Sequence, residues 1–144
     1  MTTFSNKLIK CLAILLLSTT AYASTDFSVI PAESGSTESS AIRVGNLAFI
    51  TGQAGGDAAN PDNTGKDIEE ALDQIRVIAN KLGGNMNNII KLNIALSNYN
   101  TDFPLLSGVI VKYFRQPYPT RATIGVTNIP GNHTVEIDAV MRMP

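Results

Sequence analysis

Few residues of this chain belong to the types that carry redox or metal chemistry. Its 144 residues include one cysteine, one histidine and no tryptophan. A single cysteine excludes a disulfide-stapled miniprotein. The single histidine, His133, stands beside Pro-Gly-Asn at 130–132, a place more typical of a loop residue than of a catalytic group or a ligand, so we predict neither an imidazole-based triad nor a histidine-rich metal site. We therefore predict no metal site and no organic cofactor.

Charge is also scarce, and neither sign dominates. Charged residues make up 16% of the sequence, with 11 Lys and Arg against 12 Asp and Glu. Such a chain presents no basic field to phosphate backbones, so nucleic acid is a poor default partner and a small-molecule ligand is favoured. Hydrophobic residues reach 44%, which together with the length suits one compact domain with its own core.

The N-terminal segment has the pattern of a targeting signal. An unbroken apolar run, CLAILLL at 11–17, follows Lys7 and Lys10, and Ala-Tyr-Ala at 21–23 then supplies a small-x-small cleavage signature. The run is far shorter than the roughly 18 residues that a membrane-spanning helix needs. The pattern predicts a secretory signal peptide over 1–23, with an uncleaved anchor as the alternative.

Removal of that segment changes the chemistry of the remaining chain, 24–144. It leaves 9 basic against 12 acidic residues and removes the only cysteine. A chain without cysteine suits an oxidising exported compartment, and it excludes thiol nucleophiles and thiolate metal sites. We expect one periplasmic or secreted domain over 24–144, with no membrane association after the signal is cleaved.

Alternating and helical hydrophobic patterns divide this domain into strands and helices. The Gly45-Asn46 pair between two strand-like runs predicts a tight hairpin. Apolar residues spaced by three and four predict a helix that opens at Asp67 with a capping-box analogue and ends at Gly83-Gly84. Strands are predicted at 27–30, 41–44, 47–51, 90–96, 120–127 and 134–143, loops at 33–40 and 52–65, and a second helix from Asn100 or Thr101 to Phe114.

The order of these elements predicts an α+β fold, with a mixed sheet of about six strands and two helices packed on one face. If the last two strands pair as a hairpin across 128–132, Arg121 and Glu136 lie on neighbouring strands, a few residues apart in register.

Apolar side chains alternate onto both faces at 47–50, and two helices can cover only one face. We therefore expect the other face to bind further copies of the chain, with a monomer carrying scattered apolar side chains as the alternative.

Three motifs stand in order along the domain. They are GNLAFITGQ at 45–53, YPTRATIGV at 118–126 and VEIDAV at 135–140. Together these motifs resemble the RidA family, formerly YjgF, of enamine and imine deaminases, and the resemblance covers nearly all of 27–142. It implies a chorismate-mutase-like fold, a homotrimer with ligand clefts between subunits, and hydrolysis of reactive 2-imino acids of the 2-aminoacrylate type to 2-keto acids and ammonia.

The resemblance also implies roles for particular residues. Arg121 matches the family's signature arginine, and a planar guanidinium suits a carboxylate because it donates two parallel hydrogen bonds. Glu136 matches the carboxylate thought to position or activate water and to move protons at the imine. Thr51 and Gly52 match a segment whose hydroxyl and backbone N–H contact the ligand, and Thr123 stands where it can donate to the bound carboxylate. Each role has a structural alternative. Arg121 could instead form an ion pair, for example with Glu136, and Glu136 could be an exposed glutamate on a strand. Thr51, Gly52 and Thr123 could be ordinary turn and strand residues.

Three positions depart from the family's pattern. Glu38 stands where the family has a tyrosine that helps to close the cleft, and an acid there would repel an anionic substrate. Ser107 replaces the family's usual asparagine, and Ile110 replaces its tyrosine. These departures motivate a second hypothesis, in which the protein is a non-catalytic exported binding protein for small carboxylates on the same trimeric scaffold.

We predict that the mature chain begins at Ser24 and assembles as a trimer, because signal cleavage removes 1–23 and the uncovered sheet face needs a partner. The intact mass of the exported protein identifies its first residue, and light scattering from the same sample measures its assembly. A full-length cytosolic monomer would contradict both expectations.

Overall fold

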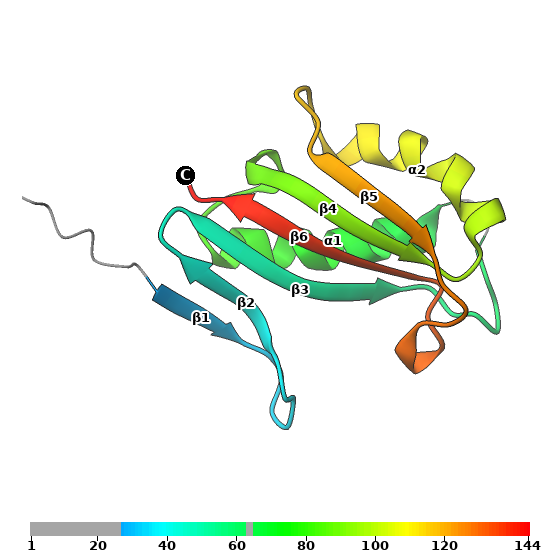
Figure 1. Cartoon of the computed structure of the whole chain (residues 1–144), viewed down its shortest axis with the longest axis horizontal. Coiled ribbons are helices and arrows are strands. Elements are labelled where there is room, and N and C mark those ends of the chain that lie inside the picture. Colours follow the sequence, from blue (N-terminus) through cyan, green and yellow to red (C-terminus); the bar gives the residue numbers. More distant parts are fainter. Residues whose placement is uncertain (1–26, 63–64) are drawn as a thin grey trace, which may run out of the picture.

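The computed structural model describes residues 27–62 and 65–144, so the expected signal peptide lies outside the described residues. The chain forms a single six-stranded sheet with helices on one of its faces (Figure 1), which confirms the α+β class. The strands are β1 (Phe27–Pro31), β2 (Ser39–Val44), β3 (Leu47–Gly55), β4 (Ile89–Leu96), β5 (Thr120–Gly125) and β6 (Val135–Arg142). The helices are α1 (Lys66–Lys81) and α2 (Tyr99–Tyr113), with short 3-10 turns η1 (Met86–Asn88) and η2 (Pro130–Asn132).

The strands follow the order β1-β2-β3-β6-β4-β5 across the sheet. Every neighbouring pair is antiparallel except β4 and β5, which run parallel with Leu92 opposite Arg121. A parallel pair needs a crossover connection, and α2 supplies it between β4 and β5. The predicted hairpin between the last two strands is therefore wrong, because β4 lies between β5 and β6.

Strand β3 is longer than predicted. It continues to Gly55 and so takes in the start of the segment 52–65 that the glycine content predicted as a loop. Pairing with β2 reaches only as far as Ile50, whereas β6 accompanies β3 along its whole length. The register with β6 shifts between Ile50 and Gln53, so that Thr51-Gly52 forms a β-bulge.

Two glutamines bind backbone carbonyl groups in the part of β3 that β2 does not reach. Gln53 donates from Nε2 to the carbonyl oxygens of Thr51 at 3.1 Å and of Gly52 at 3.0 Å. Gln74 of α1 donates from Nε2 to the carbonyl oxygen of Ala54 at 2.7 Å. These bonds supply partners to backbone groups where the strand pairing is incomplete.

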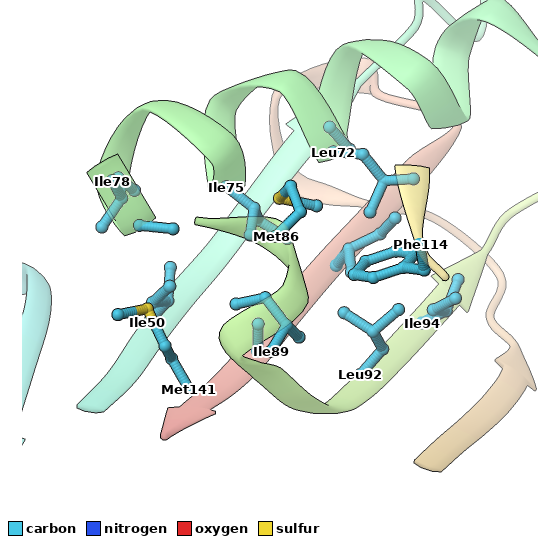
Figure 2. Close-up of a cluster of buried hydrophobic side chains, with 14 of the residues drawn as sticks. Ile50, Leu72, Ile75, Ile78, Met86, Ile89, Leu92, Ile94, Phe114 and Met141 are labelled. Carbon is cyan, nitrogen blue, oxygen red and sulfur yellow. The ribbon is translucent and has the colours of Figure 1, made fainter. Parts of the chain in front are cut away.

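Helix α1 packs across the sheet through the predicted stripe of apolar residues. Burial of each large aliphatic side chain contributes roughly 1.5–3 kcal/mol relative to its exposure, which fixes the helix on the sheet. Figure 2 shows members of this stripe gathered over Ile50, Ile94 and Met141 of the sheet. The buried residues of α1 are Ile68, Ala71, Leu72, Ile75, Ile78 and Ala79.

The start of α1 differs from the predicted capping box. Its N-cap is Gly65, whose φ of 93° favours glycine, and no side chain caps the helix there. Asp67 instead accepts hydrogen bonds from Thr134 Oγ1 at 2.7 Å and from the backbone N–H of Asp62 at 3.3 Å. Because Thr134 is fully buried beside the start of β6, Asp67 ties the helix to the sheet.

Helix α2 is joined to α1 by a polar cluster. The Tyr113 hydroxyl donates to the carbonyl oxygen of Glu69 at 3.1 Å and to Asp73 Oδ1 at 2.6 Å, and Lys112 Nζ lies 2.6 Å from Glu69 Oε1. Burial and the bond to Asp73 raise the pKa of Tyr113 well above its usual value, so the hydroxyl stays a donor. Neither described helix is long and apolar enough to cross a membrane.

The sheet face opposite the helices carries an apolar patch on β1, β2 and β3. Neighbouring strands place its side chains next to one another, for example Val29 beside Ile42 and Ile42 beside Phe49. The members of the apolar patch, all exposed, are Phe27, Val29, Ile42, Val44 and Phe49. As the alternation predicts, two helices leave one face of the sheet without cover.

A buried carboxyl group lies in the first turn of α2. Asp102 is only 7% exposed, and burial, reinforced by the nearby charge of Asp67, raises the pKa of its side chain. A raised pKa means that the folded protein binds the proton more tightly than the unfolded chain does. The stabilising effect of that proton is complete at low pH and is lost as the pH rises through the pKa of the folded state.

We predict that Asp102→Asn raises the free energy of unfolding at about pH 7, where burial disfavours the ionised form that Asp102 takes in the unfolded chain, and that the gain shrinks toward about pH 3, where the acid is protonated in both states. Urea denaturation of both proteins across this range measures the difference. A gain that stays constant with pH would show that the ionisation of Asp102 does not oppose folding.

Candidate functional site

Strand β5 carries two of the predicted site residues, Arg121 and Thr123. They pair with Leu92 and Ile94 of β4, and neighbouring residues on adjacent strands project to the same face of a sheet. Leu92 and Ile94 are buried under the helices. Arg121 and Thr123 therefore lie on the helix-covered face, and because β5 is an edge strand, Arg121 remains exposed.

Arg121 lines a hollow of about 400 Å³ beside α2. The other lining residues are Leu92, Ser107, Ile110, Val111, Tyr118 and Pro119. Arg121 is the charged member of this set, the hydroxyls of Ser107 and Tyr118 are polar, and the remaining walls are apolar. Such a hollow suits a small molecule with a carboxylate group and an apolar body. Two of the positions that depart from the family's pattern, Ser107 and Ile110, thus lie beside Arg121.

Thr123 contributes a hydroxyl group without a partner. Its Oγ1 atom is buried and forms no hydrogen bond with any described residue. A buried hydroxyl left unpaired costs about 1–3 kcal/mol, and such atoms are rare in folded proteins unless a ligand or a partner chain completes them. The unpaired hydroxyl lies two residues from Arg121 on the same face of β5, where the resemblance places a donor to the ligand carboxylate.

Glu136 lies on the other face of the sheet. Its chain neighbours Val135 and Ile137 are fully buried on the helix side, and its partners across the adjacent strands are Ala54 and Ala95. Side chains alternate along a strand, so Glu136 projects from the uncovered face, as the sequence predicts.

The bulge in β3 brings Gly52 against Glu136. A methyl group built at Gly52 would lie 2.6 Å from Glu136 Oε1, well inside van der Waals contact, so the absence of a side chain lets the carboxylate lie against the backbone. Thr51, the other bulge residue, donates from Oγ1 to Glu38 Oε2 at 3.1 Å. The uncovered face therefore brings Thr51, Gly52 and Glu136 together and adds Glu38.

A second hollow, of about 670 Å³, opens beside the bulge, between the β1–β2 connection, β3 and α1. Its walls are mostly polar and include the side chains of Glu38, Gln53 and Lys81. The full lining is Pro31, Ala32, Glu33, Ser36, Glu38, Ser40, Thr51, Gly52, Gln53, Gln74, Val77, Ile78 and Lys81.

Arg121 and Glu136 both lack a counter-charge. Within 27–62 and 65–144, neither side chain makes an ion pair or a hydrogen bond with another described residue. The ion pair considered as an alternative for Arg121 and Glu136 is absent, because the two project from opposite faces and their strands are separated by β4. One chain therefore holds two separate groups of candidate site residues, called half-sites below: Arg121 with Thr123 on the helix side, and Glu136 with the bulge on the uncovered side.

Two features of the half-sites were missed by sequence reasoning. Tyr118 lines the hollow beside Arg121 and is 45% exposed, although the sequence indicates only that it belongs to a motif. Asp138 lies on the uncovered face, two residues from Glu136, and accepts a hydrogen bond from Asn93 Nδ2 at 2.8 Å. The two-residue spacing from Glu136 is the signal that would have placed Asp138 on that face.

The described residues contain no group of three or more His, Cys, Asp or Glu side chains placed to hold a metal ion. His133, the lone histidine, lies between η2 and β6 with Nδ1 2.8 Å from the carbonyl oxygen of Gly56. The groups that the two half-sites offer to a ligand are therefore a guanidinium, carboxylates, hydroxyls and backbone amides.

A protein-family model described as endoribonuclease L-PSP matches residues 33–143 of this chain. The chain belongs to this family. The matched range contains both half-sites, and RidA and YjgF proteins are among the similar solved structures.

Two similar sequences bear the name 2-iminobutanoate/2-iminopropanoate deaminase. The protein of Dermatophagoides farinae is 33% identical over 107 residues, which covers 72% of this chain and 83% of the relative. The protein of Mus musculus is 29% identical over 106 residues and covers 71% and 78%. A RutC family protein of Sinorhizobium fredii is 33% identical over 109 residues and covers 73% and 86%.

Solved structures agree with the fold. RidA from an Antarctic Psychrobacter bacterium has a TM-score of 0.68 at 32% identity, covering 80% of this chain and 94% of its own. A YjgF family member from Neisseria meningitidis has a TM-score of 0.71 at 18% identity, covering 83% and 97%, a likeness of fold alone. The RidA-like fold expected from the motifs is thereby confirmed.

We predict that Thr123→Val leaves the free energy of unfolding unchanged or raises it by up to about 1 kcal/mol, because valine keeps the shape of threonine and removes the unpaired hydroxyl. Thr123→Ser, which keeps the hydroxyl and loses the methyl group, should lower it by about 1 kcal/mol. Urea denaturation compares the three proteins. Loss of stability in the valine variant would mean that the hydroxyl has a partner in the assembled protein.

Proposed function

We propose that this protein hydrolyses reactive 2-imino acids and their enamine tautomers to 2-keto acids and ammonia. The observation that carries the proposal is an arginine without a counter-charge, Arg121, in the wall of an otherwise uncharged hollow. The deaminase names of two relatives support the same reaction class.

Arg121 binds the substrate carboxylate. Two parallel N–H donors of the guanidinium match the two carboxylate oxygens and so fix the orientation of a small molecule as well as its position. The unpaired hydroxyl of Thr123 lies on the same face and donates to the same group. The apolar walls provided by Leu92 and Ile110 take the aliphatic part of the substrate.

Glu136 manages water and protons at the imine carbon. Water adds to C2 of the protonated imine, and Glu136 accepts the proton that the water loses. The carboxyl group then returns this proton to the amino nitrogen. The C–N bond breaks as the keto group forms, ammonia leaves, and the Glu136 carboxylate takes up the hydroxyl proton and releases it to solvent. Imines hydrolyse readily in water, so positioning together with acid-base catalysis suffices for the reaction.

The complete site needs two copies of the chain. Arg121 and Glu136 project from opposite faces of one sheet, so a single protomer does not offer both to one small substrate. Strand β5 lies at the sheet edge, where Arg121 is open to a neighbouring protomer, and the apolar patch on the uncovered face needs cover. A closed homotrimer supplies both, with Arg121 of one protomer facing Glu136 of the next.

We predict that Arg121→Ala lowers kcat/KM for 2-iminobutanoate about 10²-fold or more and that Glu136→Gln lowers kcat by roughly 10²- to 10⁴-fold. The assay generates the imine in situ with threonine dehydratase and follows its loss. Arg115→Ala is the matched control, since Arg115 is an exposed arginine that does not line the hollow of Arg121. Equal rates for wild type and Arg121→Ala would rule out this mechanism.

Mixed assemblies test whether the two half-sites belong to different protomers. Coexpression of Arg121→Ala and Glu136→Gln chains in equal amounts should restore about a quarter of wild-type activity, because a cleft is intact when one chain brings Arg121 and its neighbour brings Glu136. Mixtures as inactive as the separate variants would place both residues in one protomer. Binding of 2-oxobutanoate without any hydrolysis would favour the exported binding protein instead.

A further inference from the structure

Glu38 lies beside the bulge of β3, at the wall of the second hollow. It lies in the connection before β2, where its backbone N–H donates to Ser36 Oγ at 3.2 Å and its carboxylate accepts from Thr51 Oγ1 at 3.1 Å. The bond from Thr51 holds the carboxylate against the bulge of β3, and the bond to Ser36 fixes the backbone of Glu38. Glu38 also lines the hollow beside that bulge.

The carboxylate of Glu38 has no cationic partner among the described residues. No described ion pair includes it, and Lys81, the cation that also lines the hollow, does not reach it. The carboxylate of Glu136, which lies against Gly52, the other bulge residue, also has no cationic partner among the described residues. The Cα atoms of adjacent residues lie about 3.8 Å apart. Two carboxylates without cationic partners, those of Glu38 and Glu136, therefore lie against the short backbone segment Thr51-Gly52.

The charges of the site residues indicate which charges the ligand carries. Arg121 requires an anionic group, and Glu136 faces the nitrogen of the protonated imine, which accounts for one carboxylate of the pair. The second carboxylate, that of Glu38, is then available to bind another positive group of the ligand. A neutral or anionic side chain would leave Glu38 uncompensated in the loaded site or would be repelled by it.

We propose that Glu38 makes this protein select 2-imino acids whose side chains end in a positive charge, such as the imine formed by oxidation of arginine. This inference rests on the function proposed above and narrows its substrate class. Glu38 is a specificity residue that binds the far end of the side chain and takes no part in the chemistry at C2.

The test compares two substrates that differ in one charge. An amino acid oxidase generates the imines of arginine and citrulline, whose side chains have nearly the same shape, the first cationic and the second neutral. Wild type should show kcat/KM about tenfold higher for the arginine imine, as expected for one charge-assisted hydrogen bond. Glu38→Gln should bring the ratio close to one by slowing the arginine imine alone, since glutamine still accepts the hydrogen bond from Thr51.

Glu33→Gln is the matched control, because Glu33 lines the same hollow but makes no described contact with Thr51. This variant should keep the wild-type ratio. A wild-type ratio near one, or an unchanged ratio in Glu38→Gln, would overturn the role of Glu38 even if both imines are hydrolysed. If no imine is hydrolysed, the proposed function fails by itself. In that case calorimetry measures the affinities of wild type and Glu38→Gln for the keto acids of arginine and citrulline. Tighter binding of the cationic keto acid by wild type alone would support the charge preference, and equal binding would overturn it.

Discussion

The parallel pairing of β5 with β4 determines where the charged residues of this protein lie. It places Arg121 in register with buried Leu92, under α2, while antiparallel β6 turns Glu136 to the opposite face. An arginine and a carboxylate on one face of neighbouring strands would neutralise each other as an ion pair. Because they are kept apart, both stay available to a ligand, and the helix crossover that parallel pairing requires also provides the walls of the hollow beside Arg121.

The bulge in β3 has a comparable effect on the uncovered face. A regular strand would alternate through Thr51 and Gly52, whereas the bulge sets both residues opposite a single residue of β6. Glycine at the second position admits the side chain of Glu136, and threonine at the first holds Glu38 by its hydroxyl. A local irregularity thus gathers residues from three separate parts of the chain, and the proposed chemistry at Glu136 depends on its register.

Local patterns predict the elements well and their pairing poorly. Spacing of three and four places the start of α1 within one residue and its end within about two residues of the observed bounds. Alternation finds β4 and assigns Glu136 to its face, since these signals arise from residues close in sequence. The partner of β5 depends on contacts between distant segments, and the likelihood of a hairpin between consecutive strands suggested the wrong neighbour. Glycines at 52–65 suggested a loop, although β6 keeps Gly52 and Gly55 in a strand. The contact between Glu38 and Thr51 joins two segments whose approach no local pattern records.

The glutamine side chains along β3 have a consequence for the behaviour of the folded protein in solution. An extended strand with free backbone groups is a template on which other chains add by edge-to-edge pairing, the route to aggregation. Gln53 and Gln74 occupy carbonyl groups of β3 beyond the reach of β2 and so blunt that template. The hollow beside the bulge can then remain open to small molecules while the strand that forms its wall resists capture by a foreign polypeptide.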